Sequence, residues 1–91
     1  PLLAPAACFV GVDVAKATIA AAITGQKSRT FVHTPDGLHA LVAWVRRTCP
    51  QGELRFVAES SGVYSRYFAF LLQDLPEITV AIVDPAPNNS K

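Results

Sequence analysis

The first third of the chain contains three short stretches rich in apolar and β-branched residues, separated by polar or glycine-containing turns. They cover residues 8–15, 17–24 and 29–33. Such runs are typical of β-strands. Connections this short join antiparallel neighbours, because a parallel return needs a crossover of roughly a dozen residues or more. The pattern therefore predicts three consecutive antiparallel strands.

The hydrophobic period changes to that of an amphipathic helix after residue 34. Thr34 can cap a helix, Pro35 fits the first helical position, and Asp36 favours the positive end of the helix dipole. Apolar residues then recur at helical spacing until Pro50 stops the helix. They are Leu38, Leu41, Val42 and Val45.

A second helix and two further strands complete the predicted elements. Residues 54–58 form a strand, Ser60 or Ser61 caps the helix, and residues 78–83 form the last strand. One face of the helix comprises Tyr64, Phe68, Leu71, Leu72 and Leu75, and a second apolar set comprises Val63, Tyr67 and Phe70. The second set indicates a helix covered on more than one side. The uninterrupted apolar run at 78–83 indicates a strand buried on both faces.

These elements predict an α/β domain with a mixed five-stranded sheet and helices on its faces. Their order is βββαβαβ, with both helices acting as right-handed crossovers between parallel strands. This order resembles that of the ribonuclease H-like fold, although other α/β folds begin similarly. A chain of 91 residues can bury roughly 64% of its unfolded surface, enough for one core. We expect one domain over residues 8–85, after an extension at 1–7 and before a tail at 86–91.

Composition and charge exclude several classes of protein. With 51% hydrophobic and 16% charged residues, the chain is not a disordered tail. No apolar stretch approaches the ~20 residues of a membrane span. The net charge of +1 predicts no strongly basic surface, so most of the charge needed to bind nucleic acid would come from elsewhere. Cys8 and Cys49 lack metal-site spacing, and we expect both to be buried, reduced thiols of an intracellular protein.

Two acidic residues stand at the ends of predicted strands. Asp13 lies near the end of the first strand, on the face opposite Val12 and Val14, and Glu59 closes the fourth strand. If these strands pair in parallel, the two carboxylates become neighbours, and a shared Mg²⁺ or Mn²⁺ would relieve their repulsion. Structural roles stay open for both. Asp13 could cap a loop or pair with Lys16, and Glu59 could favour the helix N-terminus that follows it.

Other polar and aromatic residues give weaker signals. Lys16 could touch a phosphate or be an ordinary surface lysine. Asp84 could approach the same edge of the sheet, but a turn aspartate before proline is the better interpretation. Tyr64 and Tyr67 could stack on bases, but their helical spacing favours core packing. His33 and His39 flank the predicted helix start and have no ligand spacing.

Four segments resemble, in order and spacing, those of the DEDD transposases, insertion-sequence recombinases related to the Piv invertases. Residues 11–16 (Gly-Val-Asp-Val-Ala-Lys) are similar to the family's Gly-Ile-Asp-Val-Ser-Lys opening. Residues 34–45 are similar to its Asn-Thr-Pro-x-Gly helix with a Leu-x-x-Trp-Leu end. Residues 58–64 (Ala-Glu-Ser-Ser-Gly-Val-Tyr) are similar to its Glu-Ala-Thr-Gly-Val-Tyr segment, and residues 83–86 (Val-Asp-Pro-Ala) to its Val-Asn-Pro-Ala segment.

This resemblance implies a RuvC-like catalytic domain for metal-dependent DNA strand cleavage and exchange. Asp13 and Glu59 would be the first two ligands of the DEDD tetrad and would hold Mg²⁺ or Mn²⁺. The family's two further aspartates lie beyond its Val-Asn-Pro segment, so this chain would be the N-terminal part of the domain and inactive alone. The resemblance also implies a bacterial cytoplasmic parent that is a homo-oligomer. The parent's partner would be DNA, with RNA as a further candidate and Lys16 as a candidate contact.

Two other functions stay open. An actin-like ATPase or sugar-kinase lobe shares the element order and an early aspartate, although residues 13–18 lack the glycines that let backbone N–H groups approach phosphate. A non-catalytic interaction domain could also retain this fold. Titration with Mg²⁺ or Mn²⁺ and a test of ATP binding would distinguish these functions.

Overall fold

The computed structural model describes residues 7–60 and 62–84, which form five strands and two helices. In chain order these are β1 (Cys8–Val14), β2 (Thr18–Ile23), β3 (Arg29–Val32), α1 (Pro35–Thr48), β4 (Leu54–Glu59), α2 (Val63–Leu72) and β5 (Ile78–Val83). The predicted small α/β domain with a mixed five-stranded sheet is confirmed. None of the described helices is long and apolar enough to cross a membrane.

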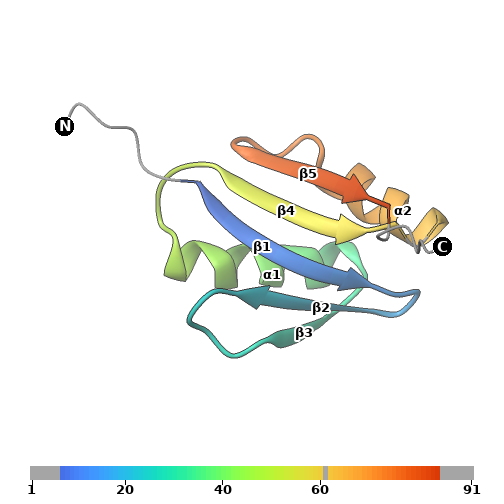
Figure 1. Ribbon diagram of the computed structural model, residues 1–91, viewed down its shortest axis with the longest axis horizontal. Helices are drawn as coiled ribbons and strands as arrows, with labels where there is room; N and C mark the ends of the chain where they lie inside the picture. The colour runs from blue at the N-terminus through green and yellow to red at the C-terminus, as the bar shows by residue number, and fades with distance from the viewer. Residues whose placement is uncertain (1–6, 61, 85–91) are drawn as a thin grey trace, which may run out of the picture.

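The strands lie side by side in the order β3-β2-β1-β4-β5 (Figure 1). β1 and β3 each pair antiparallel with β2, as the short connections predict. On the other side of β1, β4 pairs with it in parallel, and β5 pairs in parallel with β4. β1 is therefore the central strand, with an antiparallel half on one side and a parallel half on the other.

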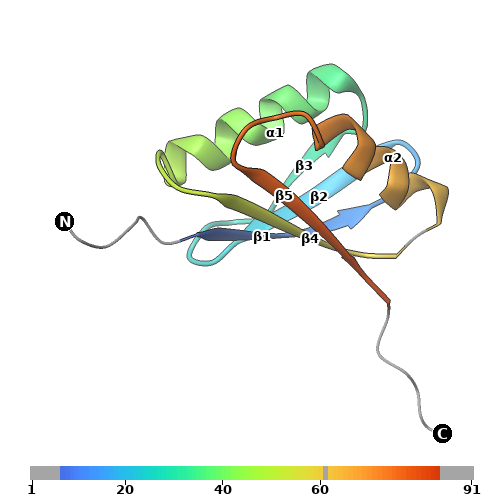
Figure 2. The same ribbon diagram turned by 90° about the horizontal axis from the view of Figure 1, so that it is seen from above.

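Both helices cover the same face of the sheet (Figure 2), so the expectation of helices on both faces is wrong. The connections from β3 to β4 and from β4 to β5 advance in the same direction along the sheet. Right-handed crossovers that advance in one direction put their helices on one side. The opposite side, which we call the open face, carries no helix of the described chain.

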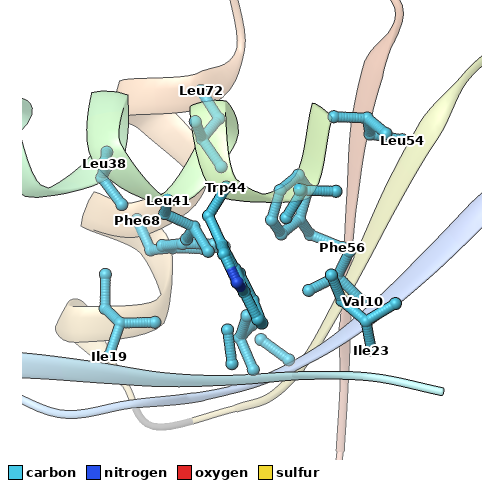
Figure 3. Packing of buried hydrophobic residues seen from close by; sticks show 14 of the residues in the cluster. Val10, Ile19, Ile23, Leu38, Leu41, Trp44, Leu54, Phe56, Phe68 and Leu72 are labelled. Carbon is cyan, nitrogen blue, oxygen red and sulfur yellow. The ribbon is translucent and has the colours of Figure 1, made fainter. Parts of the chain in front are cut away.

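The core fills the space between the helices and the covered face (Figure 3). Strict alternation in β1 and β2 sends every second side chain into it. The rings of Phe56 from β4 and Phe68 from α2 pack edge to face, with centroids 5.9 Å apart. The largest fully buried side chains are Phe56, Phe68, Ile19, Leu41, Leu54, Leu72, Val10 and Val45, together with Ser65.

The start of α1 follows the sequence prediction. The Thr34 hydroxyl accepts a hydrogen bond from the Gly37 N–H at 3.0 Å, and Pro35 occupies the first turn. Hydrophobic periodicity does not reveal the steric need for a glycine at position 37. A Cβ placed there would overlap the carbonyl oxygen of Val32, because α1 begins directly against the end of β3. The absence of a side chain at Gly37 therefore sets how closely α1 approaches the sheet.

The start of α2 differs from the prediction. Its N-cap is Gly62, with a φ of 66° and no capping side chain, so Ser60 is not the cap. Ser61 lies outside the described residues. Glycine adopts this left-handed conformation without the steric cost of a Cβ. The buried Ser65 instead ties the first turn to β4, because its hydroxyl donates to the Glu59 carbonyl oxygen at 3.1 Å.

The outer side of α2 and the strand β5 are more exposed than the sequence suggests. Tyr64 and Tyr67 remain 37% and 42% exposed, so their expected core packing is wrong. The second apolar set of α2 is not covered within the described chain, since Phe70 is 62% exposed. β5 is not buried on both faces either, because it lies at the sheet edge and its Thr79, Ala81 and Val83 stand on the open face.

The two cysteines form a disulfide, which corrects the expectation of reduced thiols. Cys8 begins β1, and Cys49 is the C-cap of α1. The helix runs back across the sheet, so residues 41 positions apart in sequence come to a Cα–Cα distance of 6.3 Å. That distance lies within the range that a disulfide spans.

We predict that Gly37→Ala lowers the free energy of unfolding by about 1–3 kcal/mol, because α1 or β3 must move to admit the methyl group. Urea unfolding followed by circular dichroism measures the change. Ala40→Ser, at an exposed position of the same helix, should change it by less than about 0.5 kcal/mol. Equal stability of Gly37→Ala and the wild type would contradict the close contact.

Reduction of the disulfide should lower the free energy of unfolding by roughly 3–4 kcal/mol, because the closed loop restricts the unfolded chain. Urea unfolding with and without a reductant measures the effect. The double variant Cys8→Ala/Cys49→Ala should not respond to reductant. Two titratable thiols in the unreduced, unfolded protein would show that the cysteines do not pair.

Candidate active site

Asp13 and Glu59 lie on neighbouring strands at the same end of the sheet. β1 and β4 pair in parallel with Val12 opposite Ala58. One residue further along both strands, this register brings Asp13 beside Glu59. Strands in a sheet lie about 4.8 Å apart. Alternation turns both side chains away from the core, onto the open face.

Both carboxylates border one shallow depression of about 360 Å³ on the open face. Small residues of β1 and β2, including Gly11, Ala20 and Ala22, line one part of it, and Val57 and Val83 line another. A Cβ added at Gly11 would meet no atom within 4 Å, so no residue of the described ranges stands over this part of β1. The depression therefore gives an extended ligand room to approach the two acids along the sheet.

The described residues offer neither carboxylate a partner. In residues 7–60 and 62–84, the ion pairs join Arg46 to Glu77 and Arg55 to Glu53, and no hydrogen bond involves the Asp13 or Glu59 side chain. The alternative in which Asp13 pairs with Lys16 is not seen there. Glu59 contributes its backbone carbonyl to α2, but its side chain does not cap that helix.

Two adjacent carboxylates are suited to a hard divalent cation. Like charges on neighbouring strands repel, and carboxylate oxygens are the ligands that Mg²⁺ and Mn²⁺ prefer. The described part of the chain contains no cluster of three potential ligands. Asp13 and Glu59 would thus provide two protein ligands, and water, substrate or further residues would complete the coordination.

Lys16 and Asp84 lie near this end of the sheet without joining the pair. Lys16 is exposed in the turn between β1 and β2. Asp84 is exposed directly after β5, whose last carbonyl oxygen, that of Val83, accepts from the Ser60 N–H at 2.8 Å. Asp84 does not form a three-ligand group with Asp13 and Glu59.

His33 is a positioning residue that sequence reasoning missed. It is only 6% exposed, and its Nδ1 lies 2.8 Å from the Ala15 carbonyl oxygen, which can only accept a hydrogen bond. Its backbone N–H donates to Ala17 at 2.9 Å, and its ring packs against Tyr67 with centroids 5.1 Å apart. His33 thereby fixes the turn that follows Asp13. The sequence pattern could have indicated its burial, because residues two apart in a strand point to the same face, and His33 follows Phe31 by two.

No model of a known protein family matches this sequence, and no curated protein matches it.

In metal-free buffer, Asp13→Asn should leave the free energy of unfolding unchanged or raise it by up to about 1 kcal/mol. The substitution removes repulsion with Glu59, and added salt should reduce the gain because the charges are exposed. Urea unfolding at two salt concentrations checks this. Glu53→Gln, which loses the pair to Arg55, should show no gain. A loss greater than 1 kcal/mol in Asp13→Asn would mean that the Asp13 carboxylate has a stabilising partner.

Proposed function

We propose that this chain is the N-terminal part of a RuvC-like transposase catalytic domain of the ribonuclease H-like type. Its parent would cleave and exchange DNA strands in the bacterial cytoplasm. The observation that carries the proposal is the pair Asp13 and Glu59, side by side at the carboxyl ends of two central parallel strands. Ligand sites of open α/β sheets lie at such strand ends.

Three of the four segments that carry the family resemblance support the proposal by their position. Residues 11–16 end β1, residues 58–64 join β4 to α2, and residues 83 and 84 end β5. These segments are far apart in sequence, and the parallel pairing of the three strands brings them to the same end of the sheet. A shared location is expected of segments that build one catalytic site.

The chain's own residues would bind the ion and leave space for the substrate. Asp13 and Glu59 would hold Mg²⁺ or Mn²⁺ through carboxylate oxygens, and the small residues of the depression would admit a phosphodiester backbone. Lys16 stands at the same end of the sheet and could contact a phosphate. A divalent ion held there supplies Lewis-acid activation of the attacking oxygen and stabilisation of the leaving oxygen.

Two carboxylates do not complete the tetrad that the resemblance implies. Mg²⁺ is usually held by carboxylates together with substrate phosphates and water, and the net charge of +1 gives little attraction for a DNA backbone. The proposal therefore places the remaining carboxylates and most DNA contacts in parts of a parent protein beyond Lys91. The isolated chain should bind metal weakly and cleave nothing.

We predict weak Mn²⁺ binding to the 91-residue chain, reduced at least about tenfold by either Asp13→Asn or Glu59→Gln, because each removes a charged ligand. Isothermal calorimetry with Mn²⁺ measures the binding. Glu53→Gln is the matched control, since Glu53 lies at the opposite end of β4, and it should bind as the wild type does.

The same samples separate the proposal from its rivals. Mn²⁺ binding that persists in both site variants contradicts the metal site. Metal-dependent plasmid nicking that disappears in Glu59→Gln would show a complete active site in this chain rather than part of one. ATP binding would favour the actin-like ATPase or sugar-kinase lobe, and binding of neither metal nor nucleotide would favour a non-catalytic interaction domain.

A further inference from the structure

The outer edge of β5 has no strand partner among residues 7–60 and 62–84, so it exposes backbone groups. β5 is the last strand of the sheet. The carbonyl oxygens of Glu77 and Val83 accept hydrogen bonds from the β4 side, from Leu54 and Ser60. Because backbone groups alternate sides along a strand, those of Ile78, Val80 and Ile82 point to the outer edge.

This edge lacks the features that usually prevent strands from pairing between molecules. Proteins protect exposed edges with charged residues, prolines or bulges. β5 (Ile-Thr-Val-Ala-Ile-Val) has no charge and no proline, and it pairs with β4 over its whole length without a bulge. The other edge strand, β3, carries Arg29 and is only four residues long. The two edges therefore differ in their capacity to accept another strand.

A groove runs beside this edge on the helix side. It has a volume of about 350 Å³ and lies between one side of α2 and the side chains of Ile78, Val80 and Ile82. Phe70 of α2 lines it and is 62% exposed. Arg66 lines it one turn before Phe70. A strand added to β5 would extend the floor of this groove and cover apolar surface as well as backbone groups.

We infer that the occupant is a second copy of this chain, paired antiparallel along β5 about a two-fold axis at Val80. This register joins Val80 to its own counterpart, and Ile78 to the Ile82 of the other copy. The two-fold axis repeats the Ile78–Ile82 pair, so three residue pairs form in total. All of these residues direct their backbone groups outward, and each pair exchanges two hydrogen bonds, which gives about six. The result is a continuous sheet with both α2 helices on the same side.

The charges along α2 are complementary under the same two-fold axis. Arg66 lies four residues before Phe70, and Asp74 lies four residues after it, just past the end of α2. As a crossover helix, α2 runs opposite to β5, and Phe70 lines the same groove as Val80. In the proposed dimer, the two α2 helices would therefore face each other near Phe70. Arg66 of each copy then approaches Asp74 of the other. Neither residue has an ion-pair partner within residues 7–60 and 62–84.

Sedimentation velocity over a range of concentrations tests this dimer with the full 91-residue chain. We expect a reversible monomer–dimer equilibrium. Arg66→Glu places like charges at both symmetric contacts and should weaken the dimer roughly tenfold. Arg66→Glu/Asp74→Arg restores opposite charges and should recover the affinity. If the double variant dimerises no better than the single one, the register is wrong.

Two proline substitutions distinguish loss of pairing at the outer edge from loss of the monomer fold. Val80→Pro removes an N–H that points outward, so it should abolish the dimer while the monomer keeps its circular dichroism spectrum. Thr79→Pro removes an N–H directed at β4 and should instead destabilise the monomer. A dimer that survives in folded Val80→Pro overturns the proposal.

Amide hydrogen exchange distinguishes a second copy from other occupants of the edge. In the dimer, the Val80 and Ile82 amides should be protected at high protein concentration and exchange freely on dilution. Protection that does not change with concentration would mean that the edge is covered within one chain. Free exchange at every concentration would mean that nothing pairs with it, and either result overturns the proposal. None of these measurements depends on the metal site.

Discussion

The parallel pairing of β1 with β4 is the interaction on which the rest of the structure depends. It joins the antiparallel half of the sheet to the parallel half, and it requires a crossover, which α1 supplies. The pairing begins beside Leu54 and ends beside the two acids. One register therefore aligns the ends of both strands, and a shift by one residue would turn Asp13 or Glu59 into the core.

The two ends of the β1–β4 pair differ in the contacts that they make. At the amino end, the Cys8 N–H donates to the Glu53 carbonyl oxygen at 2.9 Å, and Arg46 donates to the Gly52 carbonyl oxygen at 2.8 Å. Backbone contacts and a covalent bond fix that end. At the carboxyl end, exposed acids face a shallow depression over small residues. The fold thus separates the contacts that stabilise it from the groups available for binding.

Local signals in the sequence were sufficient for much of the fold. Thr34, Pro35 and Asp36 identify the start of α1 because capping, fixed φ and the helix dipole all act within one turn. Alternation around Asp13 identifies the face on which it lies. Alternation alone does not show that Glu59 lies beside Asp13. The two residues are neighbours only if β1 and β4 pair in parallel, and that pairing is known only from the sheet.

Features that depend on distant contacts could not be predicted in this way. The apolar run of β5 is compatible with a buried strand or an exposed edge. The choice depends on the strand order and on the fact that no helix of the described chain covers the open face. The sequence favoured Ser60 or Ser61 as the N-cap of α2 rather than Gly62, because hydrophobic periodicity does not reveal a residue with positive φ. The cysteines gave no sign of pairing, because their contact arises from the path of α1 across the sheet.

That covalent link has a further consequence for how the chain would respond to cleavage. The disulfide joins the first residue of the central strand to the residue that ends α1, and it encloses β1, β2, β3 and α1 in one ring. A protease that cuts a turn inside the ring, for example at Gly25 between β2 and β3, would leave both pieces attached. Release of a fragment would need a second cut or reduction, so the first half of the domain can be nicked without being lost.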